Sequence, residues 1–243
     1  MMKRPNPKVR PVPATRAPVQ ARLMASLFVL AGLASGPANA LPNITWSTVV
    51  NNSYTAPDST RSFFSYNQPS INDDGLVVFR ARAKAATGEG GSTGGEGQPI
   101  RGIFTRDMSI AGSPINPLAI NGQTLVPTPN NLGKKFTEFP AFPRIDATSS
   151  AIAFRAQSQP VYEYTPVGGT ETRAGTSGVY TTQGSNGTLV TGASQLGMVP
   201  GQSQYQVPNQ PAGTKFDQFP GAPSPTGNLV TFKGNFTEKI NGT

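Results

Sequence analysis

The chain has 243 residues, of which 20 are Lys or Arg and 12 are Asp or Glu, so its formal net charge is +8. The length is sufficient for one all-β domain or two small domains with a buried core. The chain contains no Cys and no His. Their absence excludes disulfide bonds, thiolate zinc sites and catalysis by a cysteine or histidine side chain.

The first forty residues have the composition of a secretory signal peptide. They carry six basic residues and no acidic residue, and they contain an apolar run from Leu23 to Leu33. A small-x-small segment follows at 38–40, as in signal peptides. The apolar run is shorter than the roughly 20 residues that a membrane-spanning helix needs. We therefore predict cleavage after Ala40 and an exported bacterial protein, either periplasmic or extracellular.

The predicted mature chain, residues 41–243, is nearly neutral. Removal of the six basic residues of the leader leaves 14 basic and 12 acidic residues, a net charge of +2. This charge gives no support for nucleic acid or a membrane surface as the partner. We expect no membrane span in the mature chain, no cofactor and no metal site.

A pattern of about 75 residues recurs along the mature chain. Each copy contains two aromatic residues three positions apart, then a proline, a turn and an apolar run that ends in a phenylalanine. These phenylalanines are Phe79, Phe154 and Phe232, which are 75 and 78 residues apart. The sequence Gly-Ile-Phe at 102–104 matches Gly-Val-Tyr at 178–180, with 76 residues between the two glycines. Several landmarks in one order make a true internal repeat the best explanation.

The repeated segments predict β-strands. Their apolar runs are four to six residues long, rich in β-branched and aromatic residues, and bounded by Gly, Asn, Asp or Pro. The mature chain shows no 3.6-residue apolar period, so we expect helix only in the signal peptide. A unit of this length holds four strands. We therefore predict a β-repeat domain over 41–243, with units at about 60–130, 131–210 and an incomplete unit at 211–243.

The pattern P-x-I-N-x-x-G-x-V-x-F at 69–79, followed by G-I/V-F/Y, resembles the blade signature of secreted bacterial β-propeller repeat proteins. It is similar, more loosely, to the S-P-D-G-x-x-I-A-F blades of TolB-type propellers, which have a shorter period. The second unit lacks the turn glycine, and the third has Pro225-Thr226 where the first has Ile71-Asn72. The resemblance covers roughly 63–234 and implies a propeller of four-stranded blades, for which most relatives have no assigned function.

The number of units is small for a propeller. Rings close with about 4–8 blades, whereas the sequence contains two full units and the start of a third. We therefore expect an incomplete ring, and a chain that is part of a longer protein. The segment 44–50 is a candidate for a closing strand.

A basic residue directly follows each strand phenylalanine. These residues are Arg80, Arg155 and Lys233. Alternation along a strand places them on the face opposite the phenylalanines. They could form a cationic patch for an anionic ligand such as a uronic acid polymer or a phosphate. Alternatively, each could pair with a carboxylate of its own or the next unit. We favour this second interpretation because residues that recur at one position of a repeat usually make the same packing contacts in each unit. The acids considered for this pairing are Asp73, Asp146 and Asp217.

Two loops interrupt the repeated pattern, and one turn carries neighbouring acidic residues. The glycine-rich segment 87–98 is expected to be a flexible loop. In the long loop 157–176, Tyr162 and Tyr164 could stack on sugars or peptides, or could cap the edge of a blade. The turn at 72–75 offers oxygen atoms for Ca²⁺, but it lacks the alternating acids and distal Glu of an EF-hand loop, so we expect a plain turn.

The predicted function is a non-catalytic module that binds an extracellular polysaccharide or protein. The alternative is a propeller-based polysaccharide lyase or glycosidase that uses acids from separate blades. The acids available for such chemistry are Glu138, Asp146, Glu163 and Asp217. Nothing in the sequence pairs any two of them, so we assign no catalytic residue. The recurring aromatic residues are expected in the core, and Trp46 is expected to pack near the N-terminal edge.

Overall fold

The computed structural model describes residues 45–84, 99–127, 133–158, 162–165, 170–174 and 177–237. The predicted signal peptide and the glycine-rich segment 87–98 lie outside these residues. The chain divides into two units, Met1–Trp46 and Ser47–Thr243, and the strands that the structure describes all lie in the second. In the described ranges the protein is all-β with antiparallel pairing, as predicted, and no sheet closes on itself. The helices there are three short 3-10 segments: η1 (Ser185–Gly187), η2 (Gln195–Met198) and η3 (Ser203–Tyr205).

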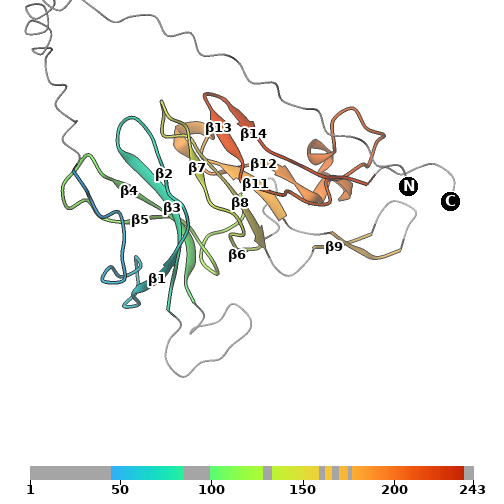
Figure 1. Ribbon diagram of the computed structural model, residues 1–243. Helices are drawn as coiled ribbons and strands as arrows, with labels where there is room; N and C mark the ends of the chain where they lie inside the picture. Colours follow the sequence, from blue (N-terminus) through green and yellow to red (C-terminus); the bar gives the residue numbers. More distant parts are fainter. Residues whose placement is uncertain are drawn as a thin grey trace, which may run out of the picture. The chain divides into compact units, whose positions relative to one another are not determined.

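The first sheet contains five strands (Figure 1). They are β1 (Phe63–Tyr66), β2 (Ser70–Ile71), β3 (Leu76–Ala83), β4 (Arg101–Asp107) and β5 (Asn116–Ile120). Strands β1 and β2 pair with successive parts of β3, so together they form one interrupted edge strand. The interruption contains Pro69, which cannot donate a hydrogen bond to the ladder. The order across the sheet is therefore this interrupted strand, β3, β4 and β5.

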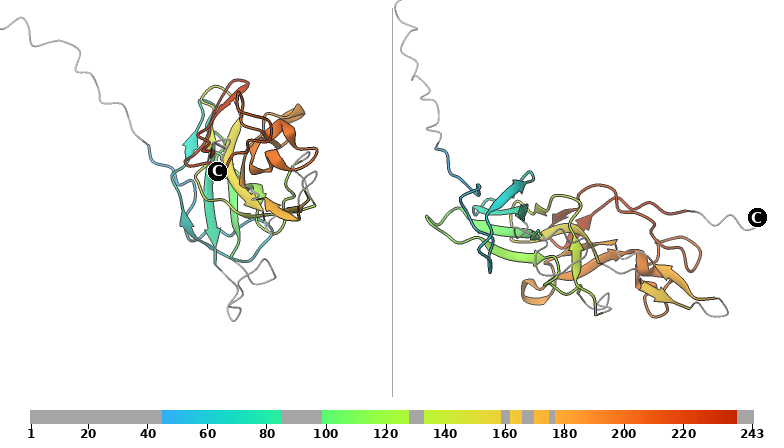
Figure 2. Two further views of the ribbon diagram at one scale, coloured as in Figure 1. Left: turned by 90° about the vertical axis from the view of Figure 1, so that its right-hand side faces the viewer. Right: turned by 90° about the horizontal axis from the view of Figure 1, so that it is seen from below.

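The second sheet repeats this arrangement. Its strands are β6 (Phe136–Glu138), β7 (Arg144–Ile145), β8 (Ile152–Ser158), β11 (Ser177–Thr181) and β12 (Val190–Ser194). Between β8 and β11, the strands β9 (Tyr162–Tyr164) and β10 (Thr172–Ala174) form a separate hairpin within the segment predicted as a long loop. The two sheets and this hairpin can be followed in the further views (Figure 2).

The third unit contributes a two-stranded sheet, β13 (Ser224–Thr226) and β14 (Leu229–Thr231). In the repeated pattern these strands correspond to β7 and β8. An isolated antiparallel bridge joins Gln218 to Asn235. It lies at the position where β6 pairs with β8 in the second sheet.

The repeated Gly-x-aromatic motif has a steric cause. Gly102 and Phe104 lie on the same face of β4, because they are two residues apart. A Cβ atom on Gly102 would lie 2.7 Å from Cζ of Phe104 and 2.8 Å from the carbonyl oxygen of Ala119. Gly178 repeats this arrangement in β11, where a Cβ atom would lie 2.7 Å from the carbonyl oxygen of Ala193. Glycine is therefore required by a close approach and not by a turn.

Successive sheets pack face to face through apolar side chains. On β3, Val77 and Phe79 belong to a cluster with the N-terminal segment, whereas Val78 belongs to the cluster shared with the second sheet. Phe154 and Tyr180 of the second sheet lie in that shared cluster. Five of the six recurring aromatic residues are buried, as expected, whereas Tyr66 is only partly buried against the first cluster. The aromatic side chains with at most 1% of their surface exposed are Phe63, Phe79, Phe104, Phe136, Phe139, Phe154, Tyr180 and Phe219.

A third apolar cluster joins the second sheet to the third unit. Val179 of β11 packs there with Phe219, and Val230 and Phe232 pack against them. The opposite face of the third unit is open to solvent, with Leu229 72% exposed. The exposed side chains of this face are Leu229, Thr231 and Lys233. Their equivalents in the first unit, on the face toward the second sheet, are Leu76, Val78 and Arg80.

Hydrogen bonds also join the turns of successive units. The side-chain amide of Asn72 donates to the carbonyl oxygen of Ser149 at 3.0 Å. The backbone N–H of Gly227 donates to a carboxylate oxygen of Asp146 at 2.7 Å. Because Asn72 and Asp146 occupy equivalent positions in the pattern, the same position fastens each of the first two units to the next.

Two expectations for the N-terminal segment are wrong. Residues 45–50 form no strand, and Val49 and Val50 instead pack as irregular chain against the apolar face of the first sheet. Trp46, which was expected to pack, is 92% exposed. The segment covers the first sheet through side chains and not through strand pairing.

Candidate functional site

Among the described residues, the largest network of ion pairs lies where the first two sheets meet. It consists of Arg80 and Arg82 on β3, Arg101 on β4 and Glu138 on β6, and we call these four residues the arginine cluster. The antiparallel register places Arg82 directly opposite Arg101. Like charges in directly opposed positions destabilise a sheet, so this pair needs a counter-charge from elsewhere.

Glu138 supplies that counter-charge from the neighbouring sheet. Its Oε1 lies 3.2 Å from Nη2 of Arg80 and 3.5 Å from Nη2 of Arg82, and its Oε2 lies 3.0 Å from Nη1 of Arg101. Oε1 also accepts a hydrogen bond from the backbone N–H of Phe139 at 3.0 Å. The carboxylate is therefore held in one orientation by three guanidinium groups and its own backbone.

One carboxylate does not neutralise three guanidinium groups, so among the described residues the cluster has an excess of two positive charges. The Nε atoms of Arg80, Arg82 and Arg101 are buried and have no hydrogen-bond partner in the described part of the chain. Burial lowers the pKa of Arg80, and the nearby charge of Arg82 lowers it further, while Glu138 acts in the opposite direction. The environment of Arg80 therefore disfavours its charge despite the ion pair.

The cluster has an inner and an outer side. The side chain of Arg80 is 11% exposed and that of Glu138 is 21% exposed, whereas those of Arg82 and Arg101 are 38% and 32% exposed. Solvent therefore reaches the cluster mainly at the two outer arginines.

The three basic residues singled out in the sequence have different environments. Arg80 pairs with a carboxylate of the next unit, as we favoured, but the partner is Glu138 and none of the three aspartates considered. At the equivalent position in the second sheet, Arg155 has a buried Nε without a partner among the described residues, and burial lowers its pKa. Lys233 is exposed. Of the three, the structure places only Arg80 in the arginine cluster.

The tyrosines of the predicted binding loop lie in the β9–β10 hairpin. Tyr164 packs against a small apolar cluster formed by Ala174, Leu196 and Val199, which fits the edge-capping interpretation. The backbone of Tyr162 pairs with that of Ala174, and its side chain lies outside the described residues.

Two of the candidate catalytic acids are each held by their own partners. Asp146 accepts hydrogen bonds from the N–H groups of Gly227 and Thr148 and from the hydroxyl of Ser149, which lower its pKa. Asp217 accepts from Lys215 at 2.7 Å and from Thr237, which lower its pKa. A general acid for glycoside cleavage needs a raised pKa, so both environments act against that role.

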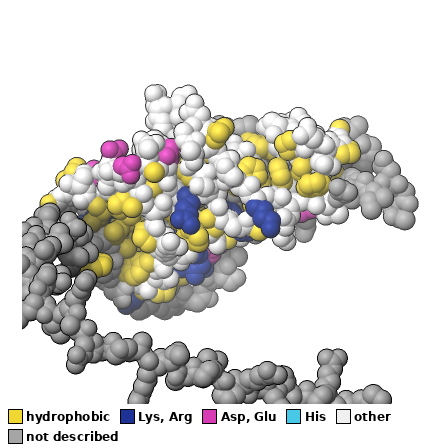
Figure 3. All heavy atoms as spheres, turned by 45° about the horizontal axis from the view of Figure 1, so that its top comes forward, with side chains coloured by type: hydrophobic (Ala, Val, Ile, Leu, Met, Phe, Trp, Pro, Cys, Tyr) yellow, Lys and Arg dark blue, Asp and Glu magenta, His cyan; other side chains and the backbone are white. Residues whose placement is uncertain are grey.

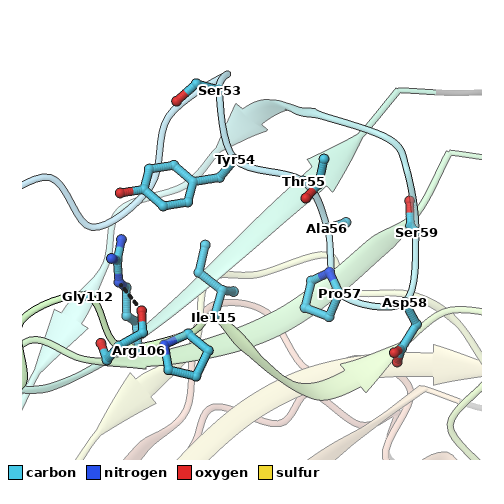
Figure 4. Close-up of a pocket in the computed structure, with 12 residues that line it drawn as sticks. Ser53, Tyr54, Thr55, Ala56, Pro57, Asp58, Ser59, Arg106, Gly112 and Ile115 are labelled. Atoms are coloured by element: carbon cyan, nitrogen blue, oxygen red, sulfur yellow. Dashed lines mark hydrogen bonds between the residues drawn. The ribbon is translucent and has the colours of Figure 1, made fainter.

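A second candidate site is a hollow of about 590 Å³ between the loop Ser53–Ser59 and the turn Gly112–Ile115 (Figure 4). Arg106 lies beside it, with 7% of its surface exposed. Its guanidinium donates to the carbonyl oxygens of Ser113 at 3.0 Å and Val49 at 2.7 Å, and it lies 4.8 Å from the centre of the Tyr54 ring. These contacts tie the N-terminal segment to β4, which gives Arg106 a structural role.

Other surface features are dispersed. On the face drawn in Figure 3, basic side chains form a few separate groups with hydrophobic and uncharged surface between them.

Within the described ranges, no three potential Cys, His, Asp or Glu ligands lie close enough together to hold a metal ion. No helix in that part of the chain is long and apolar enough to cross a membrane.

No family model, curated protein or solved structure matches this chain. The resemblance to propeller repeat proteins therefore rests on the sequence pattern, and the arginine cluster stands on its own geometry.

Proposed function

We propose that this chain is an exported, non-catalytic binding module of the β-propeller type, which attaches to an extracellular polysaccharide or protein. Export is supported by the signal-peptide pattern of residues 1–40. A chain without cysteine also needs no disulfide chemistry outside the cytoplasm.

The propeller architecture is supported by how the units relate. The first two sheets share one strand order, with the first strand interrupted at the same place, and all their pairings are antiparallel. Each sheet packs its faces against the preceding and following segments of the chain, as propeller blades do. The third unit begins with the same strand pair.

The observation that carries the binding function is the composition of the arginine cluster. In the part of the chain that the structure describes, this ion-pair network contains three arginines and one carboxylate, and the arginines occupy that carboxylate. Hydrolysis of a glycosidic bond would require two carboxyl groups facing one sugar, one of them with a raised pKa. A group of fixed cations at a sheet junction is suited instead to holding a ligand.

The test combines retention with turnover. The purified chain is incubated with insoluble cell-wall material and with soluble neutral and acidic polysaccharides, and both the bound fraction and the polymer length are measured. We expect saturable retention on at least one material and no shortening of any polymer. Shortening of a polymer, or retention on none of the materials, would contradict the proposal. When the chain is expressed for this test, N-terminal sequencing of the exported protein should give Leu41 as its first residue.

A further inference from the structure

We propose that the arginine cluster is a binding site for one oxyanion group, a carboxylate, sulfate or phosphate carried by the ligand, which enters beside Arg82 and Arg101. This inference rests on the proposed binding function and names the chemistry that the module recognises. It follows from the charge, the free donors and the exposure of the cluster.

Charge gives the first argument. Three guanidinium groups surround a single carboxylate, and two of them are held opposite each other by the strand register. An arginine cannot lose its proton at any ordinary pH, and no second carboxylate of the described residues pairs with the cluster, so an anion from outside or water can meet the excess charge. A partly enclosed position strengthens its attraction for an anion, because screening by water is weaker there than at an open surface.

The free donors give the second argument. Each guanidinium presents five N–H groups in a planar fork, and Glu138 contacts one terminal nitrogen of each arginine. The Nε–H groups stay buried without a partner in the described part of the chain. Because these Nε–H groups are buried, the donors open to a ligand are the remaining terminal N–H groups of Arg82 and Arg101, whose side chains are 38% and 32% exposed. An oxyanion has several acceptor oxygens and can bind such terminal groups through parallel hydrogen bonds.

The position of Glu138 gives the third argument. It occupies the inner side of the cluster with Arg80, while Arg82 and Arg101 are more exposed. An incoming anion would share these two arginines with Glu138 and would be repelled by its charge. Glu138 therefore acts as an internal competitor, and its neutralisation should strengthen anion binding. A purely structural ion pair predicts only a loss of stability.

The second sheet provides an internal comparison. Arg155 occupies the position of Arg80, but Gln157 and Ser177 stand where the first sheet has Arg82 and Arg101. A cluster of three arginines therefore occurs at only one of these two equivalent positions. We expect one oxyanion site per chain, not one per unit.

The experiment uses the full chain and measures the binding of sodium sulfate, sodium phosphate and sodium galacturonate by calorimetry, against sodium chloride at equal ionic strength. We expect saturable binding of at least one oxyanion with a stoichiometry of one. Comparing the affinities for sulfate and phosphate with that for galacturonate shows whether the site prefers a tetrahedral oxyanion or a planar carboxylate. Arg82→Gln and Arg101→Gln should each weaken binding roughly tenfold or more, because a charged hydrogen bond is lost.

Two variants provide the controls. Arg144→Gln removes one positive charge from β7, outside the cluster, and should leave the affinity unchanged. Glu138→Gln should increase the affinity while it lowers the unfolding temperature. If the glutamine variants at 82 and 101 do not fold, Arg82→Lys and Arg101→Lys keep the charge but lose the planar fork, and they should still weaken binding.

The inference is overturned if no oxyanion binds more tightly than chloride, if Arg144→Gln weakens binding as much as the cluster variants do, or if Glu138→Gln weakens it. Its failure is distinguishable from failure of the proposed function. Retention on a polysaccharide that is unaffected by the cluster variants would leave the binding module standing without this site. Shortening of a polymer would refute the non-catalytic function whatever the cluster binds.

Discussion

The glycine of the repeated Gly-x-aromatic motif can be tested by adding a single methyl group. In Gly178→Ala, the new Cβ atom would lie 2.7 Å from the carbonyl oxygen of Ala193 and 3.0 Å from the hydroxyl oxygen of Tyr180. The carbonyl belongs to β12, which pairs with β11 at this point, so it cannot move without disturbing the ladder. The tyrosine ring is fully buried, with its centre 4.8 Å from that of Phe136.

Overpacking of this kind costs roughly 1–3 kcal/mol of stability. For a domain of about 200 residues, that corresponds to a fall in the unfolding temperature of about 2–12 °C. The matched control is Gly192→Ala in β12 of the same sheet, where the nearest atom to a new Cβ lies 3.6 Å away. This control should be neutral, or more stable by about 0.4–1 kcal/mol because the unfolded chain loses freedom.

Chemical denaturation of both variants, followed by fluorescence, measures the midpoint and the slope. We expect a lower midpoint for Gly178→Ala with an unchanged slope, and no loss for Gly192→Ala. If Gly178→Ala is as stable as the parent chain, the close approach is not the reason for this glycine. Equal losses in both variants would likewise refute the steric argument.

Three further predictions concern the ion cluster, the turns and the core. Glu138→Gln should lower the free energy of unfolding by about 1–3 kcal/mol, because a partly buried charged acceptor is lost, and denaturant titration measures this. The lowered pKa of Asp146 means that its contribution to stability is complete above about pH 4 and is lost as the pH falls through its folded-state pKa. Asp146→Asn should therefore show a smaller loss of unfolding temperature on acidification than the parent chain, and an equal loss would contradict this. Phe154→Ala should cost about 3–5 kcal/mol, because the side chain is fully buried between sheets. Leu229→Ala should change stability by less than about 0.5 kcal/mol, because Leu229 is exposed, and thermal unfolding of the two variants compares them.

The repeat made much of the fold predictable. Strand phenylalanines recurring at a fixed period indicated buried β-strands, and Phe79 and Phe154 are buried as expected. The interrupted first strand and the β9–β10 hairpin were not predicted, because short strands of two or three residues have no periodicity to detect. Trp46 was misplaced because a large apolar side chain is usually buried, and its position outside the repeat gave no further information.

The arginine cluster was only partly predictable. Arg80 was singled out by repetition, but Glu138 was not linked to it, because Ser65 and Gln218 stand at the equivalent positions in the other units. The signal for the other two arginines was present. Pairing Phe79 with Phe104 in an antiparallel sheet places Arg82 opposite Arg101, since each lies three residues from its phenylalanine. The partner from the neighbouring sheet required the packing of the sheets, which no local pattern encodes.

The most direct test of the arginine cluster as a ligand site observes its Nε–H groups by NMR in the isotope-labelled chain during titration with sulfate and with galacturonate. Arg155 serves as the internal reference, because its Nε is also buried without a partner in the described residues but lies outside the cluster. We predict that the Nε–H signals of Arg82 and Arg101 shift saturably with one of these anions while that of Arg155 stays in place. Unmoved cluster signals, or an equal shift of Arg155, would contradict the assignment of an oxyanion site to the junction of the first two sheets.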